Sequence, residues 1–244
     1  MREGPALSVV VPAFNEEGYL GPLLDSLERA RERLARERGK TAEVIVVDNA
    51  STDGTAALAR ARGARVVFEP HRQIAAARNA GVRAAVGEIV ATCDADNVVS
   101  DNLLVRIDEE MADPRAVGGG VRILPERQRW DTDLLFWFFD RAALILGTSF
   151  GVLFARRETF ERIGGFPTEI YVGEDAFFVL GLKREARRRR GKFVSIRDAF
   201  IRTSLRKIDQ FGFGNILWQH VKFLFAPWRL RRREAARTWY DVRK

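Results

Sequence analysis

The stretch Gly87–Asn97, GEIVATCDADN, is the part of the chain that decides the predicted fold. Its residues Ile89–Thr92 are apolar or small and predict a short buried strand. Asp94 and Asp96 follow, and because residues two apart in an extended chain point to the same side, both carboxylates can be aimed at one point. Such a pair suits Mg²⁺ or Mn²⁺, which prefer oxygen ligands and keep positions for water and phosphate oxygens. By themselves, the two acids also fit a solvated turn with capping aspartates.

Apolar strands alternate with amphipathic helices in the first part of the chain. The strands are predicted at Leu7–Val11, Glu43–Val47, Ala64–Phe68 and Glu88–Thr92. The helices are predicted from an N-cap at Asn15 to Gly39, after the loop Asp48–Thr55, and over Gln73–Val86. Strands that alternate with helices at this spacing predict βαβ units and a parallel sheet.

Polar side chains gather where these predicted strands end. They are Asn15, Glu16, Asp48, Asn49, Asp53, Asp94 and Asp96. Ligands of open parallel sheets bind at the carboxyl ends of the strands. The sequence therefore predicts a ligand-binding cleft at this edge.

The pattern is less regular after residue 100. Helices are predicted at Asp101–Ala112, Trp130–Leu146, Arg157–Ile163 and Glu174–Arg190, and strands at Ala116–Leu124 and Ser149–Ala155. Three consecutive glycines, Gly118–Gly120, indicate a close backbone approach or a bulge in the first of these strands.

The composition is that of a soluble globular protein, with 46% hydrophobic and 30% charged residues in a chain of 244. The single cysteine, Cys93, excludes an intramolecular disulfide, fits a reducing compartment and is expected in the core. We find no signal peptide, and no uncharged run approaches the roughly 20 residues of a membrane helix. A cytoplasmic protein, soluble or bound to the inner face of the cell membrane, is expected.

The net charge is +8, and basic clusters at Arg187–Arg190 and Arg229–Arg233 carry much of it. Such clusters fit nucleic acid, anionic lipid, a phosphorylated substrate or simply solvated helix faces. No nucleic-acid-binding module accompanies them, so no nucleic-acid partner is expected.

An aromatic segment, Phe211–Trp228, leads into the second basic cluster. Tryptophan beside arginine is typical of a helix that lies in the headgroup plane of an anionic membrane. The same residues also fit packing on the rest of the chain or on a second subunit.

Several motifs, taken in order, resemble those of family 2 glycosyltransferases. They are VVVPAFNEE at Val9–Glu17, VVDNASTDGT at Val46–Thr55, AAARNAG at Ala75–Gly81, CDAD at Cys93–Asp96, ARRETFERIGGF at Ala155–Phe166 and GED at Gly173–Asp175. The resemblance covers roughly residues 7–195 and implies an α/β protein of the GT-A fold, with a mostly parallel sheet flanked by helices and with C-terminal amphipathic helices. It further implies a catalytic domain over 1–207, with a nucleotide-binding half at about 1–115 and an acceptor half at about 116–207, followed by a helical tail at 208–244.

The resemblance also implies roles in binding a nucleoside-diphosphate sugar donor with Mn²⁺ or Mg²⁺. Asp96 corresponds to the metal ligand, Asp94 to the contact with ribose or sugar, and Arg78 to the basic residue at the nucleotide or diphosphate. The wall for base and ribose corresponds to Pro12, Ala13, Phe14 and Glu16, and the base pocket to Asp48 and Asn49. Family members often carry a second aspartate where this chain has Asn49, which leaves uracil, guanine and thymine open as the base.

Within the acidic pair Glu174-Asp175, the second residue corresponds to the family's general base. A carboxylate there would take the proton of an acceptor hydroxyl as it attacks the anomeric carbon, giving inversion. The segment Arg202–Lys207 is either a loop that closes over the diphosphate or a solvated turn. The implied activity is that of a hexosyltransferase acting on an unidentified acceptor, lipid-linked or a polysaccharide precursor. A nucleotidyltransferase and a non-catalytic membrane-surface scaffold of the same fold are the alternatives.

Overall fold

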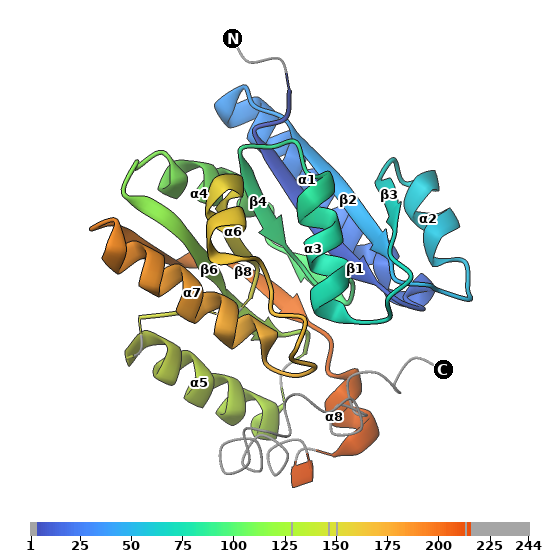
Figure 1. Cartoon of the computed structure of the whole chain (residues 1–244). Coiled ribbons are helices and arrows are strands. Elements are labelled where there is room, and N and C mark those ends of the chain that lie inside the picture. The colour runs from blue at the N-terminus through green and yellow to red at the C-terminus, as the bar shows by residue number, and fades with distance from the viewer. Residues whose placement is uncertain (1–3, 128, 146, 150, 213, 216–244) are drawn as a thin grey trace.

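The protein is built on one eight-stranded mixed sheet with helices on both faces (Figure 1). The computed structural model describes residues 4–127, 129–145, 147–149, 151–212 and 214–215. The strand order is β3-β2-β1-β4-β7-β6-β8-β5, so the amino-terminal strands form one side of the sheet and the later strands form the other.

The amino-terminal side is the predicted alternation of strands and helices. Its elements are β1 (Leu7–Ala13), α1 (Glu17–Arg38), β2 (Ala42–Asp48), α2 (Thr55–Ala61), β3 (Arg65–Phe68), α3 (Ile74–Ala84) and β4 (Ile89–Thr92). β1 pairs in parallel with β2 and β4, and β2 pairs in parallel with β3. The parallel sheet expected for this half is therefore confirmed.

The second side is mixed rather than parallel. Its elements are β5 (Asn97–Val99), α4 (Leu103–Met111), β6 (Ala116–Pro125), α5 (Trp130–Ile145), β7 (Leu153–Arg156), α6 (Arg157–Ile163), α7 (Glu174–Arg188), β8 (Lys192–Thr203) and α8 (Arg206–Phe211). β7 runs antiparallel to both β4 and β6, and β5 runs antiparallel to β8. β5 is a strand that the sequence did not predict, since its three residues fall below the length at which apolar periodicity can be recognised.

Two hydrophobic cores lie on opposite faces of the sheet because successive residues of a strand point in opposite directions. Val9 and Val11 of β1 belong to the core under α1 and α4. Val10 belongs to the other core, under α3, α6 and α7. Helix α3 packs closely there, since a Cβ at Gly81 would lie 2.2 Å from Cγ1 of Val10.

Close packing also explains the glycine run in β6. A Cβ on Gly119 would lie 2.1 Å from the carbonyl oxygen of Val194, and the pairing of β6 with β8 shifts register between Ala116 and Gly118. The expected close approach and irregularity are both confirmed.

Asn15 does not cap α1, contrary to the sequence-based expectation. Glu16 occupies the N-cap position, and Asn15 has a positive φ of 51°. Asparagine tolerates this left-handed conformation because its short side chain can bond locally. Here its Oδ1 accepts from the backbone N–H of Thr52 at 2.8 Å, which ties the loop after β1 to the loop after β2.

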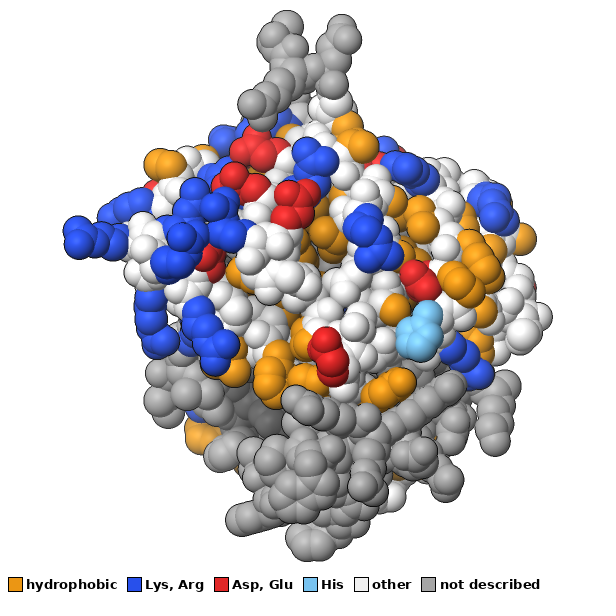
Figure 2. Space-filling model, viewed as in Figure 1, with side chains coloured by type: hydrophobic (Ala, Val, Ile, Leu, Met, Phe, Trp, Pro, Cys, Tyr) orange, Lys and Arg blue, Asp and Glu red, His pale blue; other side chains and the backbone are white. Residues whose placement is uncertain are grey.

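The predicted basic end of α7 is visible in Figure 2, where Lys and Arg side chains gather at the left of the molecule over the end of this helix. Arg187, Arg188, Arg189 and Arg190 are all exposed. Within the described ranges, no helix combines the length and hydropathy needed to cross a membrane. The predicted amphipathic tail at 208–244 lies almost wholly outside the described residues; only the short helix α8 and a few following positions belong to them.

Candidate functional site

The loops that follow β1, β2 and β4 meet at one edge of the sheet. The parallel register places Ala13 beside Asp48, and the backbone N–H of Asn49 donates to the carbonyl of Ala13 at 2.8 Å. The buried N–H of Glu16 donates to Oγ1 of Thr55 at 2.8 Å. The convergence predicted from the strand ends is therefore confirmed.

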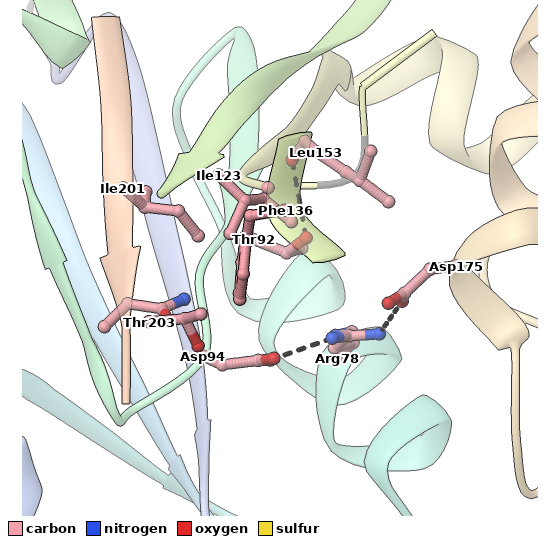
Figure 3. Close-up of a pocket in the computed structure, with 11 residues that line it drawn as sticks. Arg78, Thr92, Asp94, Ile123, Phe136, Leu153, Asp175, Ile201 and Thr203 are labelled. Atoms are coloured by element: carbon pink, nitrogen blue, oxygen red, sulfur yellow. Dashed lines mark hydrogen bonds and ion pairs between the residues drawn. The ribbon is translucent and has the colours of Figure 1, made fainter. Parts of the chain in front are cut away.

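Arg78 on α3 is the centre of an acidic cluster (Figure 3). Its Nη2 donates to Asp94 at 2.8 Å, and its Nη1 donates to Glu174 at 2.9 Å and also to Asp175. The side chain of Arg78 is 6% exposed, whereas that of Asp94 is 47% and that of Asp175 34% exposed. A buried cation thus holds together two carboxylates that remain open to a ligand and one, Glu174, that does not.

Electrostatics in this cluster follow from burial and charge. Burial works to lower the pKa of Arg78, but the neighbouring carboxylates, Asp175 foremost, outweigh it and raise that pKa. Burial and, after it, the negative charge of Asp175 raise the pKa of Glu174, Arg78 opposes both, and the net result is a pKa of about 7. Two adjacent carboxyl groups in such different environments can take different roles in one reaction.

A cavity of about 250 Å³ opens beside this cluster. Arg78, Asp94 and Asp175 line one side of it, and Figure 3 shows them pointing toward one another at its edge. The remaining lining residues are Thr92, Asn97, Ile123, Phe136, Gly151, Leu153, Ile201 and Thr203. The cavity therefore joins the strand ends of the first half to β6, α5 and β8 of the second.

Asp96 belongs to a second ion cluster, separate from that of Arg78. Its carboxylate accepts from Oγ of Ser204 at 3.1 Å and lies 3.1 Å from Nη2 of Arg206. Arg206 also makes a bidentate pair with Glu16, with both N–O distances at 2.7 Å. Glu16, expected at the donor wall, is thus fully buried against an arginine.

The expectation that Asp94 and Asp96 aim at one point is wrong for this structure. The strand β4 ends at Thr92, so the alternation of an extended chain does not continue to the two aspartates. A turn follows, in which the N–H of Asn97 donates to the carbonyl of Asp94 at 3.2 Å. Each carboxylate consequently reaches a different arginine.

Both residues of the expected base pocket, Asp48 and Asn49, make hydrogen bonds within the protein. Oδ1 of Asp48 accepts from the N–H of Ser51 at 2.9 Å. The amide of Asn49 donates to the carbonyls of Glu69 and His71 at 2.8 and 2.7 Å, which fixes the loop after β3.

The other expected wall residues are buried or covered by a neighbour. Phe14 has the guanidinium of Arg72 3.7 Å from its ring centroid. Pro12 and Ala13 are buried at the end of β1.

The oxygen donors at this edge fit a divalent cation completed by substrate. Among the described residues, no three His, Cys, Asp or Glu side chains form a cluster that could hold a metal. The carboxylate of Asp96 nevertheless already pairs with a cation, the guanidinium of Arg206, and the hydroxyl oxygen of Ser204 lies beside it. Mg²⁺ and Mn²⁺ commonly use one or two carboxylates with waters and phosphate oxygens, so a small donor set is sufficient.

Sequence reasoning assigned no specific role to Glu174, Arg72 or Arg206. Glu174 was named only as the first member of an acidic pair, and Arg72 had no motif. Arg206 was part of a basic segment with two open interpretations, and its ion pair with Glu16 spans 190 positions in sequence. Pairing at that separation leaves no local signal in the chain.

The comparisons with known proteins identify the family and the fold of this chain. The family model described as glycosyl transferase family 2 matches residues 8–167, which is more than half of the chain. An uncharacterized glycosyltransferase of Mycobacterium bovis is 38% identical over 108 residues, covering 44% of this chain and 44% of that protein. The succinoglycan biosynthesis protein ExoO of Rhizobium meliloti is 35% identical over 123 residues, covering 49% of this chain and 32% of that protein. The matches thus span less than half the length of these curated relatives.

Solved structures share the fold. The mannosyltransferase of Pyrobaculum calidifontis, determined with GDP-Man and Mn²⁺, aligns with a TM-score of 0.63 at 22% identity, covering 99% of this chain and 74% of that one. Glucosyl-3-phosphoglycerate synthase of Mycobacterium tuberculosis, determined with Mn²⁺ and UDP-glucose, aligns with a TM-score of 0.60 at 22% identity, covering 93% and 79%. The fold is GT-A, and the chain belongs to glycosyl transferase family 2.

Proposed function

We propose that this chain is a metal-dependent, inverting glycosyltransferase that moves a sugar from a nucleoside-diphosphate sugar to an acceptor hydroxyl. The observation that carries the proposal is the arrangement at the cavity, where Arg78 joins the donor-side carboxylate Asp94 to the carboxylate of Asp175. Two solved structures of the same fold contain GDP-Man or UDP-glucose together with Mn²⁺, which supports a donor of this class.

In the proposed mechanism the donor diphosphate lies at the strand ends, with the base near Phe14 and Asp48. Asp96 would hold the divalent ion, which supplies positive charge to the departing diphosphate. Asp94 would contact the ribose or sugar.

Asp175 is the proposed general base. The acceptor oxygen forms a bond to the anomeric carbon from the face opposite the diphosphate, its proton passes to the Asp175 carboxylate, and the bond from the anomeric carbon to the phosphate oxygen breaks. Arg78 holds Asp175 in place through its Nη1. Glu174, buried behind it, also binds Nη1 and so limits the movement of the guanidinium.

The acceptor is proposed to be lipid-linked or a polysaccharide precursor. ExoO is named for succinoglycan biosynthesis, and a Pseudomonas aeruginosa relative, 31% identical over 131 residues, is named as an undecaprenyl-phosphate 4-deoxy-4-formamido-L-arabinose transferase. The proposed catalytic domain is 1–207, and peripheral contact with an anionic membrane is proposed for the tail at 208–244.

The first experiment is calorimetric binding of UDP, GDP, dTDP and CDP, each with and without Mn²⁺. One nucleotide should bind at least about tenfold more tightly with the metal than without it, because the ion offsets repulsion between the diphosphate and the acidic site. The same titrations on Asp96→Asn should lose the metal-dependent part. Absence of binding by every nucleotide, with or without Mn²⁺, in a folded protein would refute the proposal.

A further inference from the structure

Arg206 contacts Oδ2 of Asp96, the carboxylate that is proposed to hold the metal ion. Its guanidinium makes two 2.7 Å contacts with Glu16 and a third of 3.1 Å with Asp96, and it lies 4.5 Å from the ring centroid of Tyr19. The arginine side chain is 11% exposed, Asp96 9% and Glu16 0%. The contacts therefore sit in a region that water screens poorly.

The charges of this cluster set a condition on metal binding. Glu16 and Asp96 are negative and Arg206 is positive, so together they carry one net negative charge. A divalent ion at Asp96 would turn this into one net positive charge and would place the ion beside the guanidinium. Like charges repel strongly at short range where the local dielectric is low. A diphosphate that binds together with the ion would make the net charge negative again and so relieve this repulsion.

We infer that Arg206 couples the metal to the donor diphosphate: it occupies the Asp96 carboxylate when neither is bound and gives way to the ion when the diphosphate comes with it. The inference rests on the proposed function, which supplies the diphosphate. Arg206 is a positioning residue here, since it acts through Asp96. By thermodynamic linkage, the factor by which the diphosphate strengthens Mn²⁺ binding must equal the factor by which Mn²⁺ strengthens diphosphate binding.

The test is the affinity for Mn²⁺, measured by calorimetry without nucleotide and again with the saturating nucleoside diphosphate that the wild type binds best. The wild type should bind Mn²⁺ roughly 5- to 150-fold more tightly with the diphosphate, the usual range for coupled sites. Arg206→Gln should bind Mn²⁺ alone several-fold more tightly than the wild type, and its coupling factor should be smaller than that of the wild type by about the same factor, because the direct attraction between ion and diphosphate remains. Unchanged or weaker binding of Mn²⁺ alone by folded Arg206→Gln would overturn the inference.

A double variant guards against misfolding, because Arg206→Gln leaves Glu16 as an unpaired buried charge. Glu16→Gln with Arg206→Gln removes both charges and keeps the net charge of the cluster equal to that of the wild type. It should also bind Mn²⁺ alone more tightly; affinity equal to the wild type would mean that Arg206 does not compete for Asp96.

The matched control is Arg127→Gln. Arg127 is an arginine that contacts Asp209 of α8 and makes no described contact with Asp96. It should keep the wild-type Mn²⁺ affinity and coupling factor, and a change as large as that of Arg206→Gln would assign the effect to α8 as a whole.

Failure of the inference can be told from failure of the proposed function. If the wild type binds no nucleoside diphosphate even with Mn²⁺, the proposed function fails. If it binds a diphosphate equally well with and without Mn²⁺, the metal dependence in the proposed function fails. If the wild type shows the coupling but Arg206→Gln keeps both its Mn²⁺ affinity and its coupling factor, only the role of Arg206 fails.

Discussion

Replacement of Arg78 by methionine tests the acidic cluster most directly. The substitution keeps an unbranched apolar stem but removes the cation that Glu174, Asp94 and Asp175 share. Removing one partner of a buried ion pair costs about 3–5 kcal/mol of unfolding free energy, because a buried charge is left uncompensated. Asp94 is 47% exposed and contributes little to this loss, which comes mainly from Asp175 and the buried Glu174.

The loss should depend on pH in a direction that the cluster dictates. The pKa of Glu174 is about 7 in the folded protein, raised by burial from an ordinary value of 4.5. A raised pKa means that the folded state holds the proton more tightly, so the contribution of Glu174 to stability is largest below about pH 4.5 and is lost as pH rises through about 7. Arg78 lowers this pKa, so its removal raises the pKa further and extends the fall to higher pH. Arg78→Met should therefore be costlier at about pH 8 than at about pH 5.5.

The assay is urea or thermal unfolding of both proteins at the two pH values. A loss of about 3–5 kcal/mol corresponds to a fall in Tm of roughly 6–20 °C for a domain of this size. Arg83→Met on the same helix is the matched control, since that side chain is 69% exposed and should change stability by less than about 0.5 kcal/mol. Adding Glu174→Gln to Arg78→Met should recover part of the loss at high pH. A loss below about 1 kcal/mol at pH 8, or one equal at both pH values, would refute this account of the cluster.

Three further predictions concern single positions. Asp175→Asn should leave nucleotide affinity nearly intact while sugar transfer falls by about 10²-fold or more, as for a lost general base; transfer assays with the matched donor check this, and near-normal transfer would place the base elsewhere. Glu174→Gln should flatten the dependence of wild-type stability on pH between about 4.5 and 7, which unfolding at several pH values measures; an unchanged slope would contradict the raised pKa. Gly81→Val should destabilise the protein by about 1–3 kcal/mol or more, because its Cβ would meet Val10 at 2.2 Å, and a stability equal to the wild type would show that α3 can move away from β1.

The predicted elements follow closely from local pattern. The helix at Arg157–Ile163 has the predicted bounds, and the end of α1 at Gly39 follows from a glycine with a φ of 62°, which completes a left-handed helix end. Side-chain periodicity and turn residues are local properties, so these features can be read from a single sequence. β7 begins at Leu153 rather than at the predicted Ser149. The exact boundary of a strand therefore depends on the local sequence less than the presence of the strand does.

The direction of β7 and the partners of Asp96, by contrast, do not follow from the local sequence pattern. Nothing in the residues Leu153–Arg156 specifies that they pair antiparallel with β4 and β6, because strand direction depends on where the connecting segments return. The geometry expected for the two aspartates also failed, because β4 ends at Thr92 and a turn redirects the chain.

By itself, the sequence determined the alternation of strands and helices, the edge at which the polar residues gather, and the family to which its ordered motifs point. These depend on spacing within the chain and on motifs that lie in order along it. Only the tertiary structure decided that Arg78 joins Asp94 to Asp175 and that Arg206 lies on Asp96 and Glu16. Ion pairs between distant segments depend on how those segments pack, and the strength of each pair depends on a burial that exists only once the chain has folded.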